Sequence, residues 1–122
     1  MAKNVVVIED FNTSRQIIKS TLEKKGYKVL EAADGREALK FFNGGEIDLV
    51  ISDYNMPHMD GGELVEYIRS LEKYKYIPIL MLSTETNMKK KERANAAKIT
   101  AWMKKPFEVD VFLKVVEKAL QV

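Results

Sequence analysis

Apolar residues along the chain follow two different spacings. Short continuous runs rich in Val, Ile and Leu are typical of strands that are buried on both faces of a parallel sheet. Between these runs, apolar residues recur at intervals of three and four, which is typical of amphipathic helices. The runs that predict strands cover residues 4–8, 28–31, 47–51, 77–82 and 101–103.

Capping and turn residues place helices between the predicted strands. Polar residues 12–14 suit the start of the first helix, and Gly26 suits its end. Asp34 and Glu37 resemble a capping box at the start of the second helix. The fourth helix has the weakest apolar pattern of the five. The apolar faces of the predicted helices lie around residues 17–22, 38–42, 64–71, 88–97 and 112–119.

The order of these elements predicts the fold. Strand and helix alternate five times with short links, which favours right-handed crossovers and a parallel sheet. Five strands suit a flavodoxin-like, doubly wound α/β fold of the (βα)5 type, with strand order 2-1-3-4-5. The 122 residues fit one domain, residues 1–122, and leave no room for a second domain of ordinary size.

Composition excludes several kinds of function. The chain has no cysteine, so it has no disulfide, thiol nucleophile or cysteine zinc site. A formal net charge of +2 is too small to indicate binding to nucleic acid. No apolar run approaches the roughly 20 residues of a membrane span. The N-terminus leads directly into a strand pattern without a signal peptide, so we expect a cytoplasmic protein without membrane or nucleic-acid partners.

The residues that follow the predicted strands are chemically complementary. In open parallel sheets, ligands bind at the carboxyl ends of the strands, where the strand order reverses. Three acids, hydroxyl groups and ammonium groups are expected to meet at this edge. They are Glu9 and Asp10, then Asp53, then Ser83 and Thr84, and finally Lys104 and Lys105.

These side chains predict a magnesium site that handles phosphate. Carboxylates that crowd together raise one another's pKa unless a cation lies among them, and Mg²⁺ prefers oxygen ligands. An aspartate such as Asp53 can act as a nucleophile and form an aspartyl phosphate. Lys105 would stabilise the charge of the phosphoryl oxygens, and Ser83 could donate a hydrogen bond to one of them.

Each residue also has a purely structural interpretation. Glu9 and Asp10 could cap a helix, Asp53 could belong to a turn, and Ser83 or Thr84 could cap the following helix. Four separate loops nevertheless bring complementary groups to one edge. This joint placement favours the functional interpretation.

Four motifs in order resemble the response-regulator receiver family, and within it the stand-alone chemotaxis (CheY-like) type. The resemblance covers essentially the whole chain, and the four motifs together are far more specific than any one of them. They are Val-Ile-Glu-Asp at 7–10, Ser-Asp-Tyr-Asn-Met-Pro-His-Met-Asp-Gly at 52–61, Leu-Ser-Thr-Glu at 82–85 and Trp-Met-Lys-Lys-Pro-Phe at 102–107.

The resemblance implies a role for each residue of the site. Asp53 matches the residue that accepts the phosphoryl group. Asp10 matches the direct Mg²⁺ ligand, Glu9 the acid that binds the metal mainly through water, and Asn55 the residue whose backbone carbonyl completes the metal shell. Lys105 matches the family's lysine, and its peptide bond to the following proline is expected to be cis.

The resemblance also implies a switch. Ser83 matches the hydroxyl that moves toward the phosphoryl group, and Trp102 matches the aromatic residue that changes rotamer in response. Asn55 and Glu85 match two positions that tune the lifetime of the phosphorylated state.

Three positions depart from the usual family pattern. Glu9 stands where family members commonly have Asp. Trp102 replaces a smaller Tyr or Phe, so we expect incomplete burial of its ring. Lys98 and Ile99 replace a common Gly-Ala pair, which suggests a changed ending of the fourth helix.

Together these features predict a phosphoacceptor response regulator of a two-component or chemotaxis system. A histidine kinase would donate the phosphoryl group to Asp53, and the domain would catalyse only its own phosphorylation and slow dephosphorylation. No output domain follows Val122, so we expect a binding partner such as a flagellar motor switch or a phosphatase. The face formed by the fourth helix, fifth strand and last helix would bind it. Its lysines are Lys89, Lys90, Lys91, Lys98 and Lys104.

Other classes of protein remain open. A phosphatase of the haloacid dehalogenase type would need a second Asp where Asn55 stands, and an FMN carrier would bind phosphate beside two repelling acids, Glu9 and Asp10. The chain could also be a degenerate receiver or relay that acts by binding alone. It could equally be a receiver excised from a larger regulator.

Overall fold

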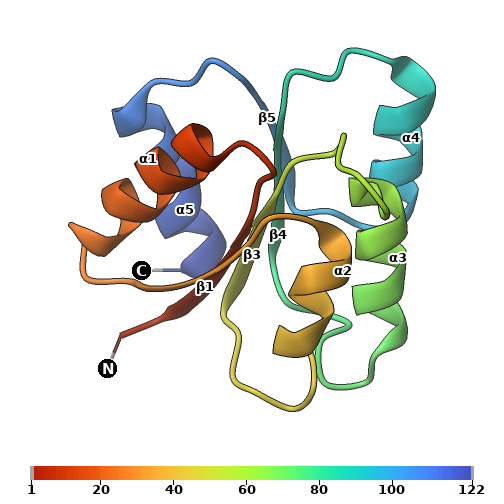
Figure 1. Ribbon diagram of the computed structural model, residues 1–122, viewed down its shortest axis with the longest axis horizontal. Helices are drawn as coiled ribbons and strands as arrows, with labels where there is room; N and C mark the ends of the chain where they lie inside the picture. Colours follow the sequence, from red (N-terminus) through yellow and green to blue (C-terminus); the bar gives the residue numbers. More distant parts are fainter. Residues whose placement is uncertain (1, 122) are drawn as a thin grey trace.

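The computed structural model describes residues 2–121 and contains a five-stranded sheet at its centre (Figure 1). All strand pairs are parallel, in the order β2-β1-β3-β4-β5. This confirms the predicted doubly wound fold. The predicted domain limits, residues 1 and 122, lie outside the described residues. The strands are β1 (Asn4–Ile8), β2 (Lys28–Ala32), β3 (Leu49–Ser52), β4 (Ile79–Ser83) and β5 (Ala101–Lys104).

Helices cover both faces of the sheet. Helices α1 and α5 lie on one face, and α2, α3 and α4 lie on the other (Figure 1). A single turn of 3₁₀-helix, η1, continues α2. The bounds are α1 (Asn12–Glu23), α2 (Gly35–Ala38), η1 (Leu39–Phe41), α3 (Gly61–Ser70), α4 (Met88–Ala96) and α5 (Val109–Leu120).

The apolar strand residues divide between two cores, one on each side of the sheet. Successive side chains of a strand point to opposite faces. In β1, Val6 and Ile8 therefore pack with α2, α3 and α4, while Val5 and Val7 pack with α1 and α5. All four are at most 1% exposed. Full burial of an aliphatic side chain contributes roughly 1.5–3 kcal/mol, so both layers are needed to stabilise the central strands.

Two strands begin later than the apolar runs suggested. Strand β3 begins at Leu49, because the Asp48 side chain accepts a hydrogen bond from the Asn4 backbone N–H (2.7 Å) ahead of the ladder. Strand β4 begins at Ile79, because Pro78 has no N–H to donate to a neighbouring strand. Pro78 still accepts a hydrogen bond from the Val50 N–H at 3.0 Å.

The helix starts differ from prediction in two places. The N-cap of α1 is Phe11, which provides no side-chain cap, so the predicted cap at residues 12–14 is wrong and those residues lie inside the helix. A full capping box, which the sequence analysis missed, opens α3: Asp60 accepts from the Glu63 N–H, and Glu63 accepts from the Asp60 N–H. Asp34 caps α2 by accepting from the Glu37 N–H (2.8 Å).

The second helix is shorter than predicted. Only one turn of α-helix forms before the tighter η1, and Phe42 leaves the helical conformation (φ −101°, ψ 43°). Its ring packs edge-on against Tyr74, with the ring centroids 5.2 Å apart. Packing of this ring into the core therefore accompanies the early end of the helix.

The ending of α4 corrects another expectation. Lys98 adopts the left-handed conformation (φ 67°) that glycine usually supplies. The backbone N–H of Lys98 donates to Asn95 O (2.9 Å), and that of Ile99 donates to Ala94 O (3.3 Å). This is a Schellman ending, so the replacement of glycine by Lys98 has not changed how the helix ends.

Candidate functional site

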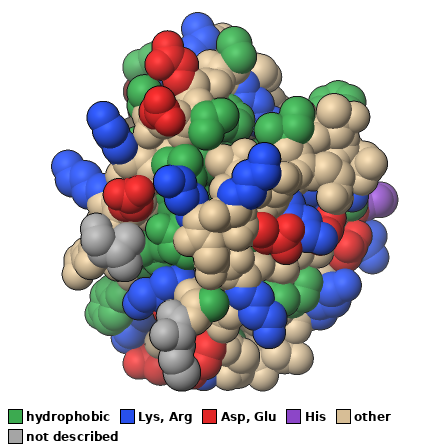
Figure 2. All heavy atoms as spheres, turned by 90° about the vertical axis from the view of Figure 1, so that its left-hand side faces the viewer, with side chains coloured by type: hydrophobic (Ala, Val, Ile, Leu, Met, Phe, Trp, Pro, Cys, Tyr) green, Lys and Arg blue, Asp and Glu red, His purple; other side chains and the backbone are tan. Residues whose placement is uncertain are grey.

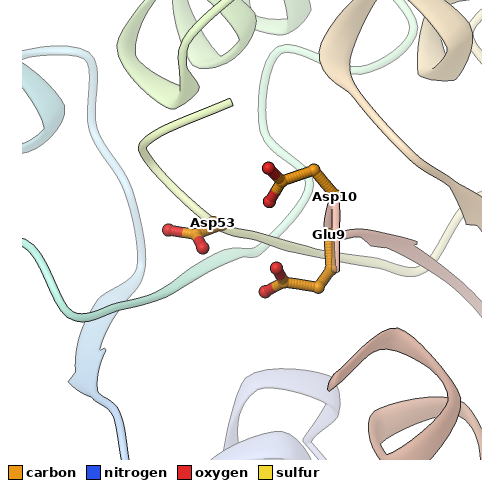
Figure 3. Close-up of side chains that lie close together, drawn as sticks. All are labelled: Glu9, Asp10 and Asp53. Atoms are coloured by element: carbon orange, nitrogen blue, oxygen red, sulfur yellow. The ribbon is translucent and has the colours of Figure 1, made fainter. Parts of the chain in front are cut away.

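Three carboxylates meet at the carboxyl ends of β1 and β3, as predicted. We call Glu9, Asp10 and Asp53 the acidic cluster (Figure 3). One oxygen from each residue lies within 4.8 Å of the others. The Asp53 backbone N–H donates to Ile8 O (3.0 Å), which fixes the loop after β3 against the loop after β1. The fold thus holds three negative groups in a space suited to a small cation.

Each carboxylate oxygen of Asp53 has a hydrogen-bond partner. Oδ1 accepts a hydrogen bond from the Tyr54 backbone N–H (2.6 Å), and Oδ2 lies 3.0 Å from Lys105 Nζ. The residue is 9% exposed, so most of its surface is shielded from solvent. Gly61 lets α3 approach from behind, because a Cβ there would lie 2.7 Å from the Asp53 carbonyl oxygen.

Lys105 joins the cluster from the loop after β5. Its backbone N–H donates to Ser83 O (3.1 Å), and its ammonium group forms ion pairs with both Glu9 and Asp53. Burial disfavours the charged ammonium, but the hydrogen bonds to Glu9 and Asp53 outweigh it and raise the pKa of Lys105. The peptide bond to Pro106 is cis, as predicted. The neighbouring Lys104 is exposed to solvent.

Glu9 is the most buried member of the cluster, at 1% exposed. Burial raises the pKa of its carboxyl group, and the nearby charge of Asp53 raises it further, against the opposing effect of Lys105. One oxygen also accepts from the Phe11 backbone N–H (3.2 Å). The Lys105 ion pair therefore offsets much of the cost of burying this carboxylate.

Asp10 differs from the other two acids because one of its oxygens lacks a partner. Oδ1 is buried, and none of the residues in the range 2–121 donates a hydrogen bond to it. A buried polar atom without a partner is costly, and such atoms often mark a missing ligand. Asp10 and Asp53, with oxygens close together, form a donor set that suits a hard divalent cation.

Ser83 lies at the end of β4 and is completely buried, whereas Thr84 is exposed. Ser83 does not cap the next helix: Asn87 does so by accepting from the Lys90 N–H (3.1 Å). Ser83 Oγ accepts a hydrogen bond from the Glu85 N–H (3.1 Å). Among residues 2–121 the Ser83 hydroxyl donates no hydrogen bond, so its proton is not used by another group there.

Trp102 lies in β5, on the sheet face covered by α3 and α4, and is half-buried, which confirms the expectation of incomplete burial. Its ring packs against Tyr54, with centroids 5.9 Å apart, and Lys91 Nζ lies 5.5 Å from the ring centroid. The indole Nε1 is buried, without a hydrogen-bond partner in the described part of the chain. Tyr54 thus links Asp53 to Trp102, because it follows Asp53 in the chain and its ring contacts the Trp102 ring.

Asn55 and Glu85 contact each other, and Lys90 joins them. Asn55 Nδ2 donates to Glu85 Oε1 (2.9 Å). Lys90 Nζ donates to the same Glu85 oxygen (2.9 Å) and to Asn55 Oδ1 (3.2 Å). Hydrogen bonds from Lys90, Asn55 and the Asn87 backbone lower the pKa of Glu85 to about 2. The sequence analysis assigned Lys90 only to a basic face and missed its place beside the site.

Comparison with known proteins agrees with this geometry. Residues 5–117 match the response regulator receiver domain family. Chemotaxis protein CheY1 of Helicobacter pylori is 38% identical over 118 residues, covering 95% of each chain. The solved structure of the Vibrio cholerae chemotaxis response regulator CheY4 is 42% identical, with a TM-score of 0.91, and the match covers 98% of this chain and 100% of that one.

A third comparison concerns the fold alone. The receiver domain of a Pseudomonas aeruginosa sensor histidine kinase is 22% identical, with a TM-score of 0.90 and full coverage of both chains. Its structure has a magnesium ion coordinated in the active site cleft.

Fold and site together define a receiver domain, a signalling module built on a doubly wound sheet with acids and a lysine at its carboxyl edge. The chain belongs to the response regulator receiver family. Members of this family are signalling regulators in two-component systems and not classical enzymes. Within residues 2–121, none of the helices has the length and apolar character needed to cross a membrane.

Proposed function

We propose that this receiver accepts a phosphoryl group on Asp53, with Mg²⁺ bound, from a histidine kinase of a chemotaxis system. The observation that carries the proposal is the acidic cluster, within 4.8 Å, with the Lys105 ammonium bound to two of its members. A chemotaxis role is supported by the similar proteins from Helicobacter pylori and Vibrio cholerae, which are chemotaxis regulators by name. That the receiver stands alone over residues 1–122 stays a prediction.

The residues present fit a magnesium ion. Asp10 offers a buried oxygen without a protein partner, and Asp53 offers a second carboxylate close to it. The backbone carbonyl of Asn55 would complete the protein ligands, and Glu9 would bind through water. When bound, the ion would neutralise charge on the acids and on the incoming phosphoryl oxygens.

Asp53 and Lys105 would carry the transfer itself. An Asp53 carboxylate oxygen forms a bond to phosphorus, while the bond between phosphorus and the donor's imidazole nitrogen breaks and its electron pair returns to the imidazole. The Tyr54 N–H holds the carboxylate in place. The Lys105 ammonium lies 3.0 Å from Asp53 Oδ2, close enough to stabilise negative charge on the carboxylate and then on the phosphoryl oxygens. The domain thus supplies orientation and charge, and the kinase supplies the activated phosphoryl group.

Ser83 and Trp102 would convert phosphorylation into a change of surface. The free hydroxyl proton of Ser83 is suited to donate to a phosphoryl oxygen, which draws the loop after β4 inward. Movement in that loop changes the space beside Trp102, whose indole N–H lacks a partner in the described structure. The face made by α4, β5 and α5 would then bind its target, such as a motor-switch protein or a phosphatase, by a population shift.

An apolar groove beside the site suits the phosphate donor. The groove has a volume of about 480 Å³, and one of its lining residues is Lys105, whose ammonium also pairs with Glu9 and Asp53. Ile17 and Val109 on its rim are 54% and 47% exposed, and nearby Phe11 is 69% exposed. Figure 2 views the α1 and α5 side, where hydrophobic side chains lie exposed among lysines and arginines. We assign this groove to the kinase segment that carries the phosphohistidine.

Beryllofluoride, an analogue of the phosphoryl group, tests the proposal. Trp102 is the only tryptophan, so its fluorescence reports on the switch. We expect a fluorescence change that requires both Mg²⁺ and beryllofluoride and that disappears in Asp53→Asn. The same substitution should abolish the mass increase produced by acetyl phosphate. If Asp53→Asn keeps either response, Asp53 is not the acceptor.

A further inference from the structure

The Lys90 side chain contacts other side chains and does not simply extend into solvent. It comes from the first turn of α4, yet its ammonium reaches back to Asn55 in the loop after β3 and to Glu85 in the loop after β4. The ammonium also lies 5.7 Å from the centroid of the Tyr54 ring. One side chain thus contacts two loops that carry the acceptor Asp53 and the hydroxyl of Ser83. We call its contacts with Asn55 and Glu85 the Lys90 bridge.

The bridge is tied closely to both loops. Asn55 is two residues after Asp53, and Glu85 donates its backbone N–H to Ser83 Oγ (3.1 Å). Glu85 is held in turn, because its second oxygen accepts from the backbone N–H groups of Thr86 (3.0 Å) and Asn87 (2.8 Å). The Glu85 side chain is only 14% exposed, so the bridge is partly shielded from solvent.

We propose that Lys90 is a positioning residue for hydrolysis of the phosphoryl group on Asp53, and that it lengthens the lifetime of the phosphorylated state. This inference rests on the proposed function. Lys90 acts through Asn55 and Glu85: it holds their side chains together across the gap between the two loops, which restricts the path of water to phosphorus. It also neutralises the Glu85 carboxylate, whose negative charge would otherwise destabilise a nearby phosphoryl group.

The reaction that Lys90 would slow is simple hydrolysis. A water oxygen bonds to phosphorus, the bond from phosphorus to the Asp53 oxygen breaks, and its electron pair returns to the carboxylate. Inorganic phosphate leaves and a proton passes to solvent. Lys90 donates no proton and touches no reacting atom in this scheme.

Autodephosphorylation measured on the full chain tests the role. The protein is phosphorylated with acetyl phosphate and Mg²⁺, the donor is removed, and the loss of phosphoprotein is followed by mass. We expect Lys90→Met to lose phosphate roughly twofold to fivefold faster than the native chain, the range that a partly exposed ion pair supports. Lys89→Met is the matched control, because no hydrogen bond or ion pair of the Lys89 side chain occurs among residues 2–121.

Two further measurements separate positioning from a general loss of structure. High salt screens exposed charge pairs, so raising the ionic strength from about 0.05 M to about 1 M should speed hydrolysis in the native chain toward the rate of Lys90→Met. In a Glu85→Gln background, Lys90→Met should have a smaller effect than it has alone. Unfolding temperature and the Trp102 response to Mg²⁺ with beryllofluoride should match in Lys90→Met and Lys89→Met.

The outcomes are distinct. A Lys90→Met rate equal to or slower than the native rate overturns the role of Lys90 while leaving the proposed function intact. A rate increase of the same size in Lys89→Met also overturns it, because only net charge would then matter. A native chain that takes no phosphoryl group from acetyl phosphate refutes the proposed function, and the inference falls with it.

Discussion

Lys98 has a left-handed backbone conformation that glycine adopts more easily. Its left-handed backbone costs a residue with a Cβ roughly 1–2 kcal/mol relative to the right-handed helix. The surrounding structure holds it there, because the Lys98 carbonyl accepts a hydrogen bond from Arg69 Nη2 (2.8 Å). The same guanidinium also donates to the carbonyls of Tyr74 (3.3 Å) and Ile77 (2.8 Å). Arg69 therefore fixes the end of α4 against the loop before β4.

Lys98→Gly should stabilise the protein. Glycine removes the strain of the left-handed conformation but adds freedom to the unfolded chain, so we expect the free energy of unfolding to rise by about 0.5–1 kcal/mol. Urea denaturation measures it. The opposite control is Gly26→Ala: Gly26 has φ +88° and nothing within 4 Å of an added Cβ, so a loss of about 1 kcal/mol would be purely conformational. A loss of stability in Lys98→Gly would contradict this account.

Individual site residues were predictable to different degrees. Glu9, Asp10 and Asp53 follow their strands directly, and the carboxyl ends of parallel strands share one edge, so their meeting followed from topology. Lys90 could not be predicted in the same way. Its contact with Glu85 depends on α4 starting at Met88, which sets the direction of the Lys90 side chain, and the pattern of that helix is weak.

Helix α1 and strand β2 are joined by a small ionic network. Glu31 of β2 accepts hydrogen bonds from Arg15 (3.0 Å), Gln16 (2.9 Å) and Lys19 (2.6 Å) of α1. Hydrogen bonds from Lys19 and Arg15 lower the pKa of Glu31. Since β2 is an edge strand covered only in part, this network helps to fix α1 over that edge of the sheet.

The network should make stability depend on pH. A carboxyl whose pKa is lower in the folded state stabilises the fold above its unfolded pKa, and loses that contribution as the pH falls through the folded pKa. We expect Glu31→Gln to lower the free energy of unfolding by about 1 kcal/mol at pH 7. The difference from the native chain should shrink below pH 4.5, the ordinary pKa of a glutamate.

Denaturation of both chains across this pH range provides the measurement. Glu72→Gln is the control, because Glu72 pairs with Lys75 while 89% exposed and should contribute little at any pH. A gap between native and Glu31→Gln that stays constant down to pH 2 would show that the Glu31 contribution is not ionic.

Element limits were less predictable than element order. The apolar runs extend to Ile47 and Ile77, but those residues pack against the core without pairing with a neighbouring strand. Pro78 has no backbone N–H, so it cannot donate a hydrogen bond to the sheet. The short α2 was not evident either, since Leu39 and Phe42 have helical spacing. Local patterns report which residues are buried, whereas strand starts and helix lengths depend on tertiary packing.

At the scale of the whole molecule, metal binding should stabilise the native fold. A ligand that binds only the folded state adds about 2.7 kcal/mol at a concentration 100 times its dissociation constant. Mg²⁺ should therefore raise the unfolding temperature. Asp10→Asn should remove most of this increase, because it replaces the carboxylate whose Oδ1 is buried without a partner in the described residues.

The control for metal binding is Asp34→Asn, an acid that caps α2 outside the cluster. It should shift the unfolding temperature without changing the increase caused by Mg²⁺. An equal response to Mg²⁺ in Asp10→Asn and the native chain would place the ion elsewhere.

The two separate cores bear on where the phosphate donor and the target would bind. Trp102 and Tyr54 belong to the packing on the α2–α4 side, while the groove assigned to the phosphate donor borders α1 and α5 on the opposite side. The sheet lies between these two layers (Figure 1). Because α5 borders this groove and also belongs to the face proposed for the target, the kinase segment and the target would meet at α5 and are expected to compete for the receiver.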